Sequence, residues 1–332
     1  MGPAGRPGPD RPRRPGLRTL TLVLQVGVTV GILVWVVIVW GPAPFAAATR
    51  VLTVPAAVAG LLLGAFGVLL QAGRWRLVAR TRGLSITPGA AVSRCWQAAF
   101  LNAVLPGGLA GDALRAVEQP RAGTDSPGAT LKRSAGTVTA ERLAGTTVVF
   151  TAAGIALLAL QPAVGLLSLA VAAVCAAVAW PWLRWLTRGD LARVAGLSVA
   201  GWAVFAAMFV VALLVVAPDV PLGQAPALAA ISLAGMSVPL NVAGWGPREG
   251  TAALGFLLVG QPPGLGVAVS VAYGLLALVS VLPGGLVLLA RTLRRDRLRP
   301  SGDPDDAGHR PPRPPSDHPR SRHARRAAQE RP

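Results

Sequence analysis

The chain has 332 residues, of which 52% are hydrophobic and only 14% are charged, whereas a soluble domain carries about 25% charged residues. The composition excludes an ordinary soluble domain and predicts an all-α membrane protein. The net charge of +18 does not indicate a nucleic-acid partner, because more than half of the basic residues lie at 6–18 and 291–331, on either side of the apolar body. Basic segments in such positions determine topology and contact anionic lipids.

The first predicted element follows a Pro/Gly/Arg-rich tail, residues 1–19, which we expect to be disordered. The apolar run at 20–40 is long enough, at about 1.5 Å per residue, to cross a hydrocarbon core of about 30 Å. Ala46-Ala47-Ala48 offers a signal-peptide cleavage site, but the run exceeds the usual apolar region of about 7–15 residues. We therefore expect a retained anchor.

Five further spans are predicted at about 51–73, 137–160, 163–182, 196–217 and 265–290. The predicted organisation is a transmembrane domain at 20–290 between two disordered tails, 1–19 and 291–332. Cys95 and Cys175 suggest neither a disulfide framework nor a metal site, and His309, His318 and His323 all fall in the C-terminal tail. We expect no catalytic triad, metal or cofactor in the body.

Two apolar segments are too short or too broken to span. The run at 95–105 ends at Pro106-Gly107-Gly108, and the run at 225–243 is interrupted by a Gly-rich stretch at 244–250 before it continues to 260. Broken helices at membrane depth are tolerated only where protein buries them or where they line a cavity. We therefore predict two re-entrant helical hairpins.

The positive-inside rule favours six full spans. With both hairpins re-entrant, both termini and the basic clusters at 74–94 (including Arg74), 115–133 and 184–193 lie in the cytoplasm of a multi-pass cell-membrane protein. If 95–111 crossed fully, the last two clusters would move outside. Each half then reads span, span, re-entrant segment, span, with the second half inverted, a pattern typical of transporters.

Charged residues inside these segments cost roughly 2.5–3.5 kcal/mol each on insertion scales and are functional candidates. Arg248 and Glu249 lie in the second break, where they either bind substrate or form a self-satisfied ion pair. Asp112 and Arg115 follow the first break at i, i+3, and an ordinary salt bridge is the alternative.

Further candidates are a charged pair and the polar groups of the breaks. Glu141 and Arg142 open the third span; as neighbours they point to different faces, and snorkelling at a helix end is the alternative. Asn102 and Asn241 either bond broken backbone or a head group, or join helices in the interior. The break glycines can offer backbone N–H groups to an anion: Gly107, Gly108, Gly244 and Gly246.

These residues carry a family resemblance. The segment 102–115, with Asn102, Pro106, Asp112 and Arg115, resembles the Asn…Leu-Pro…Gly-Asp…Arg motif of the lysylphosphatidylglycerol synthase transmembrane-region family, also described as flippase-like. Glu141-Arg142 is similar to its acidic–Arg pair, and the segment 239–249 resembles its Pro…Gly-Gly-x-Gly…Glu segment. The matches follow the family's order over about 20–290.

The resemblance implies a membrane domain that moves, or offers a path for, a phospholipid or polyprenyl-linked lipid. Our leading hypothesis is that the hairpins meet near the midplane, where Arg248 and Arg115 attract the lipid phosphate and Glu249, Asp112 and Glu141 balance or relay charge. In bifunctional members a separate soluble domain transfers lysine from aminoacyl-tRNA to the lipid. We find no counterpart of it here and expect no synthase activity.

Two other functions stay open from the sequence. One is a membrane-embedded transferase acting on a lipid head group, with Asp112 or Glu249 as base. The other is a non-catalytic membrane partner that docks a cell-envelope enzyme through the basic tails. Membrane lipids are the partners expected in every case, and association into a homo-oligomer stays open.

Overall fold

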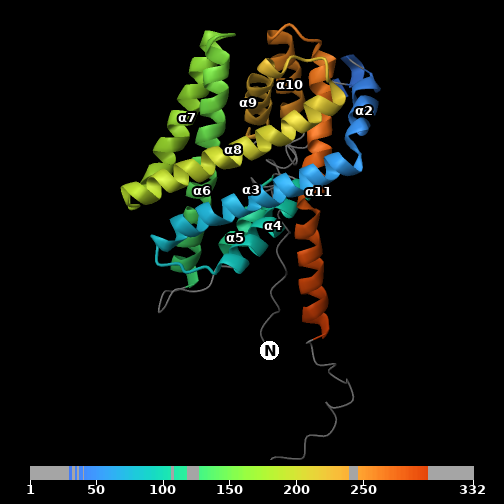
Figure 1. Cartoon of the computed structure of the whole chain (residues 1–332). Coiled ribbons are helices and arrows are strands. Elements are labelled where there is room, and N and C mark those ends of the chain that lie inside the picture. The colour runs from blue at the N-terminus through green and yellow to red at the C-terminus, as the bar shows by residue number, and fades with distance from the viewer. Residues whose placement is uncertain are drawn as a thin grey trace, which may run out of the picture. The chain divides into compact units, whose positions relative to one another are not determined.

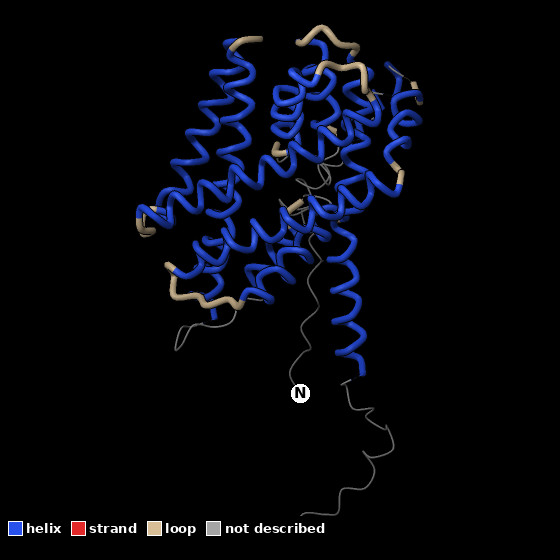
Figure 2. Tube along the Cα trace, in the orientation of Figure 1, coloured by secondary structure: helices blue, strands red, loops and turns tan. Residues whose placement is uncertain are grey.

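The computed structural model describes residues 30–31, 34–35, 37–39, 41–105, 108–117, 127–238 and 246–297. Within these residues every regular element is a helix, as predicted (Figure 2). Contacts divide the chain into two units, Met1–Ala290 and Arg291–Pro332. The residues of the site lie in the first unit.

The structure consists of long helices, with two hairpins of shorter helices between them (Figure 1). In chain order they are α2 (Ala43–Ala48), the 3₁₀ turn η1 (Thr49–Val51), α3 (Val54–Arg80), α4 (Pro88–Val104), α5 (Ala110–Val117), α6 (Pro127–Leu158), α7 (Pro162–Leu183), α8 (Arg188–Val216), the 3₁₀ turn η2 (Leu222–Gln224), α9 (Ala225–Met236), α10 (Pro247–Leu258) and α11 (Pro263–Arg297).

Among the described residues, five helices are long and apolar enough to cross a membrane: α3, α6, α7, α8 and α11. They coincide with five of the six predicted spans, and two thirds of the sixth, at 20–40, lie outside the described residues. Large apolar side chains on their outer faces, such as Leu62, Leu167 and Leu286, are 65–66% exposed. Such surfaces suit lipid and not water. The exact number of spans stays a prediction.

Four helix boundaries differ from the predicted ones by seven or more residues. α8 begins at Arg188 and not at 196, and α11 ends at Arg297 and not at 290. α3 continues about two turns beyond residue 73, because Trp75, Val78 and Ala79 are buried against its neighbours. α6 begins at Pro127 and not at 137, so Lys132 and Arg133 are helical. In each case basic residues beyond the predicted span belong to the helix.

The short helices pair into two hairpins, α4 with α5 and α9 with α10. Each helix of the second pair has 12 residues and is about 18 Å long, less than the roughly 30 Å of a hydrocarbon core. The open ends of this hairpin meet, since Gln224 Nε2 donates a hydrogen bond to the Val259 carbonyl at 3.4 Å. Their lengths agree with re-entrant hairpins, whose place in the membrane stays a prediction.

Small residues let the long helices approach closely. A Cβ added to Gly64 of α3 would lie 2.3 Å from the Ser280 Cβ of α11, so nothing larger than glycine fits without a shift. α11 also contacts α4, where the Trp96 indole N–H donates to the Ser280 carbonyl at 3.1 Å. The same order of elements occurs twice, as α3, α4–α5, α6 and as α8, α9–α10, α11. Inversion of the second set stays a prediction.

Candidate functional site

The break between α4 and α5 is closed by Asn102. Its Oδ1 accepts a hydrogen bond from the Gly111 backbone N–H at 2.8 Å, which satisfies a donor in the first turn of α5. A Cβ at Gly111 would lie 2.1 Å from the Ala98 carbonyl oxygen, so the two helices need glycine there. Gly108 has φ +57°, which glycine adopts without strain. This local geometry holds Asp112 against α4.

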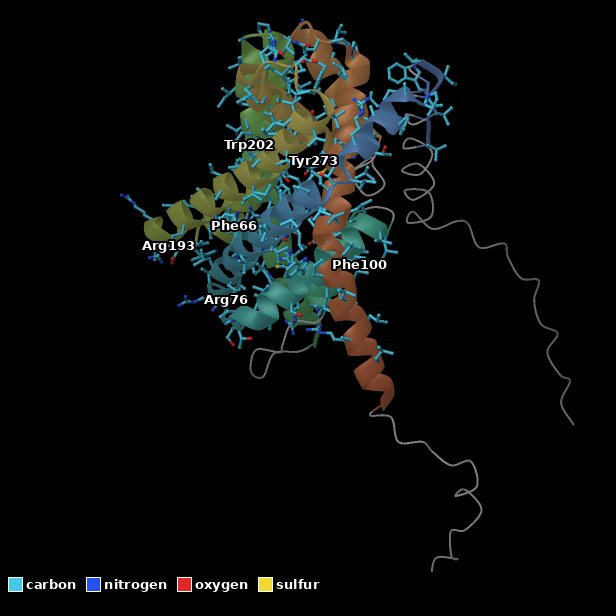
Figure 3. The ribbon with its side chains drawn as sticks, turned by 45° about the vertical axis from the view of Figure 1, so that its right-hand side comes forward. Phe66, Arg76, Phe100, Arg193, Trp202 and Tyr273 are labelled. Carbon is cyan, nitrogen blue, oxygen red and sulfur yellow. The ribbon has the colours of Figure 1, made fainter. Side chains whose placement is uncertain are left out.

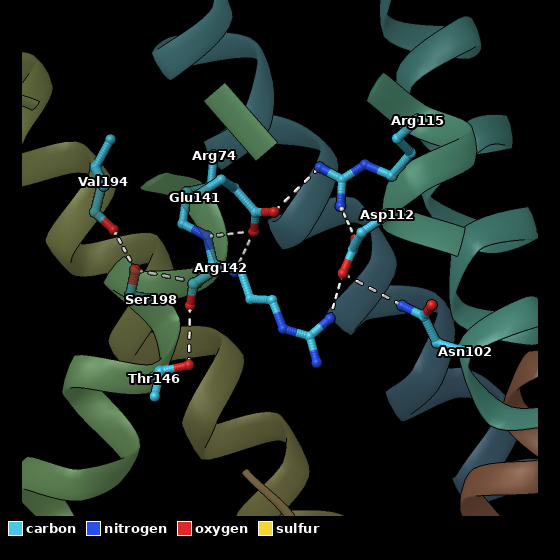
Figure 4. Close-up of polar contacts among 9 residues, drawn as sticks. All are labelled: Arg74, Asn102, Asp112, Arg115, Glu141, Arg142, Thr146, Val194 and Ser198. Carbon is cyan, nitrogen blue, oxygen red and sulfur yellow. Dashed lines mark hydrogen bonds and ion pairs between the residues drawn. The ribbon is translucent and has the colours of Figure 1, made fainter. Parts of the chain in front are cut away.

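Glu141 of α6 is the centre of a buried ion cluster (Figure 4). It is 1% exposed. Its carboxylate accepts hydrogen bonds from Arg74 Nε of α3 at 2.8 Å and from Arg115 Nη2 of α5 at 3.1 Å. The Arg115 guanidinium also lies 4.4 Å from the centroid of the Trp75 ring, a cation–π contact. One carboxylate thus joins three helices and is balanced by two opposite charges.

Asp112 connects this cluster to its exposed edge. Its Oδ1 accepts from Arg115 Nη1 at 3.1 Å, and its Oδ2 pairs with Arg142 Nη1. Arg142 also donates to the Gly108 carbonyl at 3.1 Å. The Arg142 side chain is 47% exposed, whereas that of Arg115 is fully buried. Arg142 is therefore the guanidinium of the cluster that is accessible from outside.

The ion cluster is not electrically balanced. Three guanidinium groups face two carboxylates, which leaves one formal positive charge on the set Arg74, Asp112, Arg115, Glu141 and Arg142. A surplus charge in a low-dielectric region favours an anion. Among the described residues, no group of three or more His, Cys, Asp or Glu side chains is placed to hold a metal ion.

A cavity of about 240 Å³ opens beside the cluster. It is bounded by α3, α6, α8 and α11 and by both hairpins. Its polar end is formed by Arg74, Asn102, Asp112, Glu141, Arg142 and Ser198, and its apolar wall includes Val149, Phe205, Leu233 and Val281. Pockets that enclose drug-sized ligands measure roughly 300–1,000 Å³. The cavity therefore has room for a head group and not for a whole diacyl lipid.

Arg248 and Glu249 form a buried ion pair at the start of α10. Arg248 Nη2 donates to Glu249 Oε1 at 2.6 Å, and Glu249 Oε2 accepts the Gly246 N–H at 2.7 Å, which caps α10. From α11, Ser270 donates to Glu249 at 3.2 Å, and the Tyr273 ring (Figure 3) lies 5.2 Å from Arg248 Cζ. Arg248 is 2% and Glu249 0% exposed. Neither lines the cavity.

The structure divides the predicted site residues into three groups. Those that gather at the ion cluster are Asn102, Gly108, Asp112, Arg115, Glu141 and Arg142. Those at the separate pair are Gly246, Arg248 and Glu249. Those outside the described residues are Pro106, Gly107, Asn241 and Gly244. Contact of any of them with a substrate stays a prediction.

Most residues that line the cavity are absent from the sequence-based set, among them Arg74, Ser198 and Trp202. The sequence ends the span at residue 73 and counts Arg74 in a basic cluster that sets topology. That span end is wrong, because Arg74 lies inside α3 and bonds Glu141. Its Nη1 also donates to Ser198 Oγ of α8 at 3.0 Å. The sequence signal for this role was a helical stripe of small and polar residues at Gly64, Gly67, Gln71 and Arg74.

Comparison with known proteins gives one family match. The family model described as "Lysylphosphatidylglycerol synthase TM region" matches the chain at residues 22–189 and 183–285. These segments contain the ion cluster and both hairpins. No curated protein matches the chain.

Proposed function

Because the chain belongs to the lysylphosphatidylglycerol synthase transmembrane-region family, we propose that it binds a phospholipid or lipid-linked substrate and translocates it across the cell membrane. The observation that carries this proposal is the cavity, in which a positively charged cluster meets an apolar wall. The positively charged cluster suits the phosphate of a lipid head group, and the apolar wall is compatible with the adjoining part of the acyl chains.

Arg142 is the residue best placed to contact the phosphate. It is the accessible guanidinium of the cluster, and a guanidinium can bind two phosphate oxygens at once. When Arg142 turns towards a substrate, Asp112 keeps its hydrogen bonds to Arg115 and Asn102. Arg115 and Arg248, which the sequence favoured for this role, are 1% and 2% exposed, so a substrate would reach them only after a rearrangement.

The position of the cavity supports translocation. Its walls come from α3, α4, α5 and α6 in the first half of the chain and from α8, α9 and α11 in the second. Rocking one half against the other would open such a cavity alternately to the two sides. The basic ends of α3, α6 and α8 then lie in the cytoplasm together with both termini, as the positive-inside rule requires.

The proposal is tested by lipid translocation in proteoliposomes. Fluorescent phosphatidylglycerol, aminoacylated phosphatidylglycerol and polyprenyl phosphate are followed as they become accessible to an external quencher. Arg142→Ala removes a charge-assisted hydrogen bond worth about 1.5–3 kcal/mol, so we expect translocation at least about 10-fold slower. Arg142→Lys keeps the positive charge but cannot bind two phosphate oxygens as a guanidinium does, so its translocation rate should lie between those of wild type and Arg142→Ala.

The matched control is Arg193→Ala. Arg193 lies on α8 with 71% of its side chain exposed, and within the described part of the chain it pairs with Asp190, three residues away. It should leave the rate unchanged. Equal translocation rates for wild type and Arg142→Ala would show that the substrate does not bind at the ion cluster. No exchange of any lipid by folded wild-type protein would contradict translocation and favour the transferase or docking functions.

A further inference from the structure

A second pocket lies at the helix ends, apart from the cavity. It measures about 270 Å³ and is lined by Arg82, Lys132, Arg133 and Trp182. Arg82 lies two residues beyond the end of α3, the two other basic residues are near the start of α6, and Trp182 is near the end of α7. None of these residues lines the cavity. Three cationic side chains and one indole thus line the same pocket.

Two contacts build this pocket and fix its shape. Arg82 Nη2 donates to the Pro181 carbonyl at 3.0 Å, which ties the end of α3 to α7. Trp182 lies directly against α6, because a Cβ at Gly136 would be only 2.3 Å from the indole Nε1. Gly136 follows Lys132 by four residues and therefore shares its helix face. The glycine brings the indole next to the two basic residues of α6.

The surroundings of the pocket resemble a membrane interface. α3, α6 and α7 are all long and apolar enough to cross a membrane, and the pocket lies where α3 and α7 end and α6 begins. More basic residues occur near these helix ends, including Arg80, Arg184 and Arg193; Figure 3 shows Arg193 near the start of α8 and Arg76 near the end of α3. Tryptophan and basic residues at span ends lie at the depth of lipid phosphates.

We propose that the pocket of Arg82, Lys132, Arg133 and Trp182 binds the phosphate group of an anionic phospholipid, at a site separate from the translocation cavity. Its charged groups match a phosphate, and its indole covers the glycerol side of the head group. This proposal rests on the geometry of the pocket alone and does not depend on transport of a lipid through the cavity. A soluble phosphate carries the same chemistry and is the other source of ligand.

The test measures lipid retention by the full-length protein in detergent, using native mass spectrometry. Dioctanoyl phosphatidylglycerol, dioctanoyl phosphatidylcholine and inorganic phosphate are titrated separately. We expect phosphatidylglycerol to be preferred, and Arg82→Gln/Lys132→Gln to weaken its binding about 30-fold, the effect of two cations near a membrane surface. Gly136→Ala should weaken it without a change of charge, because the added Cβ displaces the indole.

Two control variants distinguish this pocket from the cavity and from the general charge of the helix ends. Arg142→Ala, which alters the cavity, should remove at most the cavity-bound lipid and leave the affinity for the remaining lipid unchanged, whereas loss of all bound lipid in that variant would place the lipid in the cavity instead. Arg188→Gln/Arg193→Gln removes two charges from the start of α8 and should have little effect on lipid binding. A loss of binding equal to that of Arg82→Gln/Lys132→Gln would show that binding depends on the total basic charge of the helix ends and not on the pocket. Equal retention of the two lipids, or inorganic phosphate binding as tightly as phosphatidylglycerol, would overturn the lipid assignment.

Discussion

Neutralising Glu141 is the change from which the structure predicts the largest single loss of stability. Both of its carboxylate oxygens accept hydrogen bonds, one from Arg74 and the other from Arg115, and the residue is 1% exposed. In Glu141→Gln the amide NH₂ must face one of these guanidinium groups, which sets donor against donor. One buried arginine therefore loses its carboxylate bond at residue 141 and keeps its other hydrogen-bond partner, Ser198 for Arg74 or Asp112 for Arg115.

The size of the effect follows from this geometry. Removing one partner of a buried ion pair costs about 3–5 kcal/mol, because the other charge is left uncompensated. The matched control is Asp190→Asn, which breaks the Asp190–Arg193 pair, whose arginine side chain is 71% exposed. An exposed pair is worth about 0–1 kcal/mol. The two substitutions make the same chemical change to a carboxylate and differ in its burial.

The measurement is equilibrium unfolding in mixed micelles of increasing SDS fraction, followed by tryptophan fluorescence. Glu141→Gln should lower the free energy of unfolding by several-fold more than Asp190→Asn. Arg115→Met/Glu141→Gln removes the uncompensated charge as well, so its loss should be smaller than the sum of the single losses by about 1 kcal/mol or more. A change within about 1 kcal/mol for Glu141→Gln, or strict additivity of the pair, would refute the reasoning.

Two further predictions concern the second hairpin and helix packing. Glu249→Gln should lower the free energy of unfolding by about 3 kcal/mol or more, since Arg248 is buried beside it. The variant protein that is folded should still translocate phosphatidylglycerol at the wild-type rate. Lost transport at unchanged stability would instead place a substrate contact at Glu249. Gly64→Ala should lower the free energy of unfolding by about 1–3 kcal/mol, because its Cβ would clash with Ser280. Gly196→Ala, where the added Cβ meets open space, should be neutral or stabilising. Similar melting midpoints for both variants would contradict close packing of α3 and α11.

Local patterns in the sequence were sufficient for several features. The apolar runs predicted five helices of membrane-spanning length, because run length depends on composition alone. The spacing of Asp112 and Arg115 predicted their contact, and the adjacency of Glu141 and Arg142 predicted that they point apart; one is buried and the other exposed. Each of these follows from the geometry of a single helix.

The sequence was less informative where a charge is stabilised by a distant partner. Considered only with its neighbours, Arg74 indicates the end of a span, because an isolated arginine is costly in lipid. Its partner Glu141 is 67 residues away, and their pairing lets α3 continue to Arg80. The same holds for Arg115, whose buried guanidinium depends on a carboxylate 26 residues away.

The sequence by itself determined that this protein consists of membrane helices interrupted by two Gly-rich breaks, and which charged residues lie near those breaks. Only the tertiary structure decided that the charges of the first break surround a cavity while Arg248 and Glu249 of the second satisfy each other. It also decided that Arg142, and not Arg115 or Arg248, is accessible. The physical reason is that helix periodicity fixes the face on which a residue lies, whereas its partners and exposure depend on which helices pack against that face.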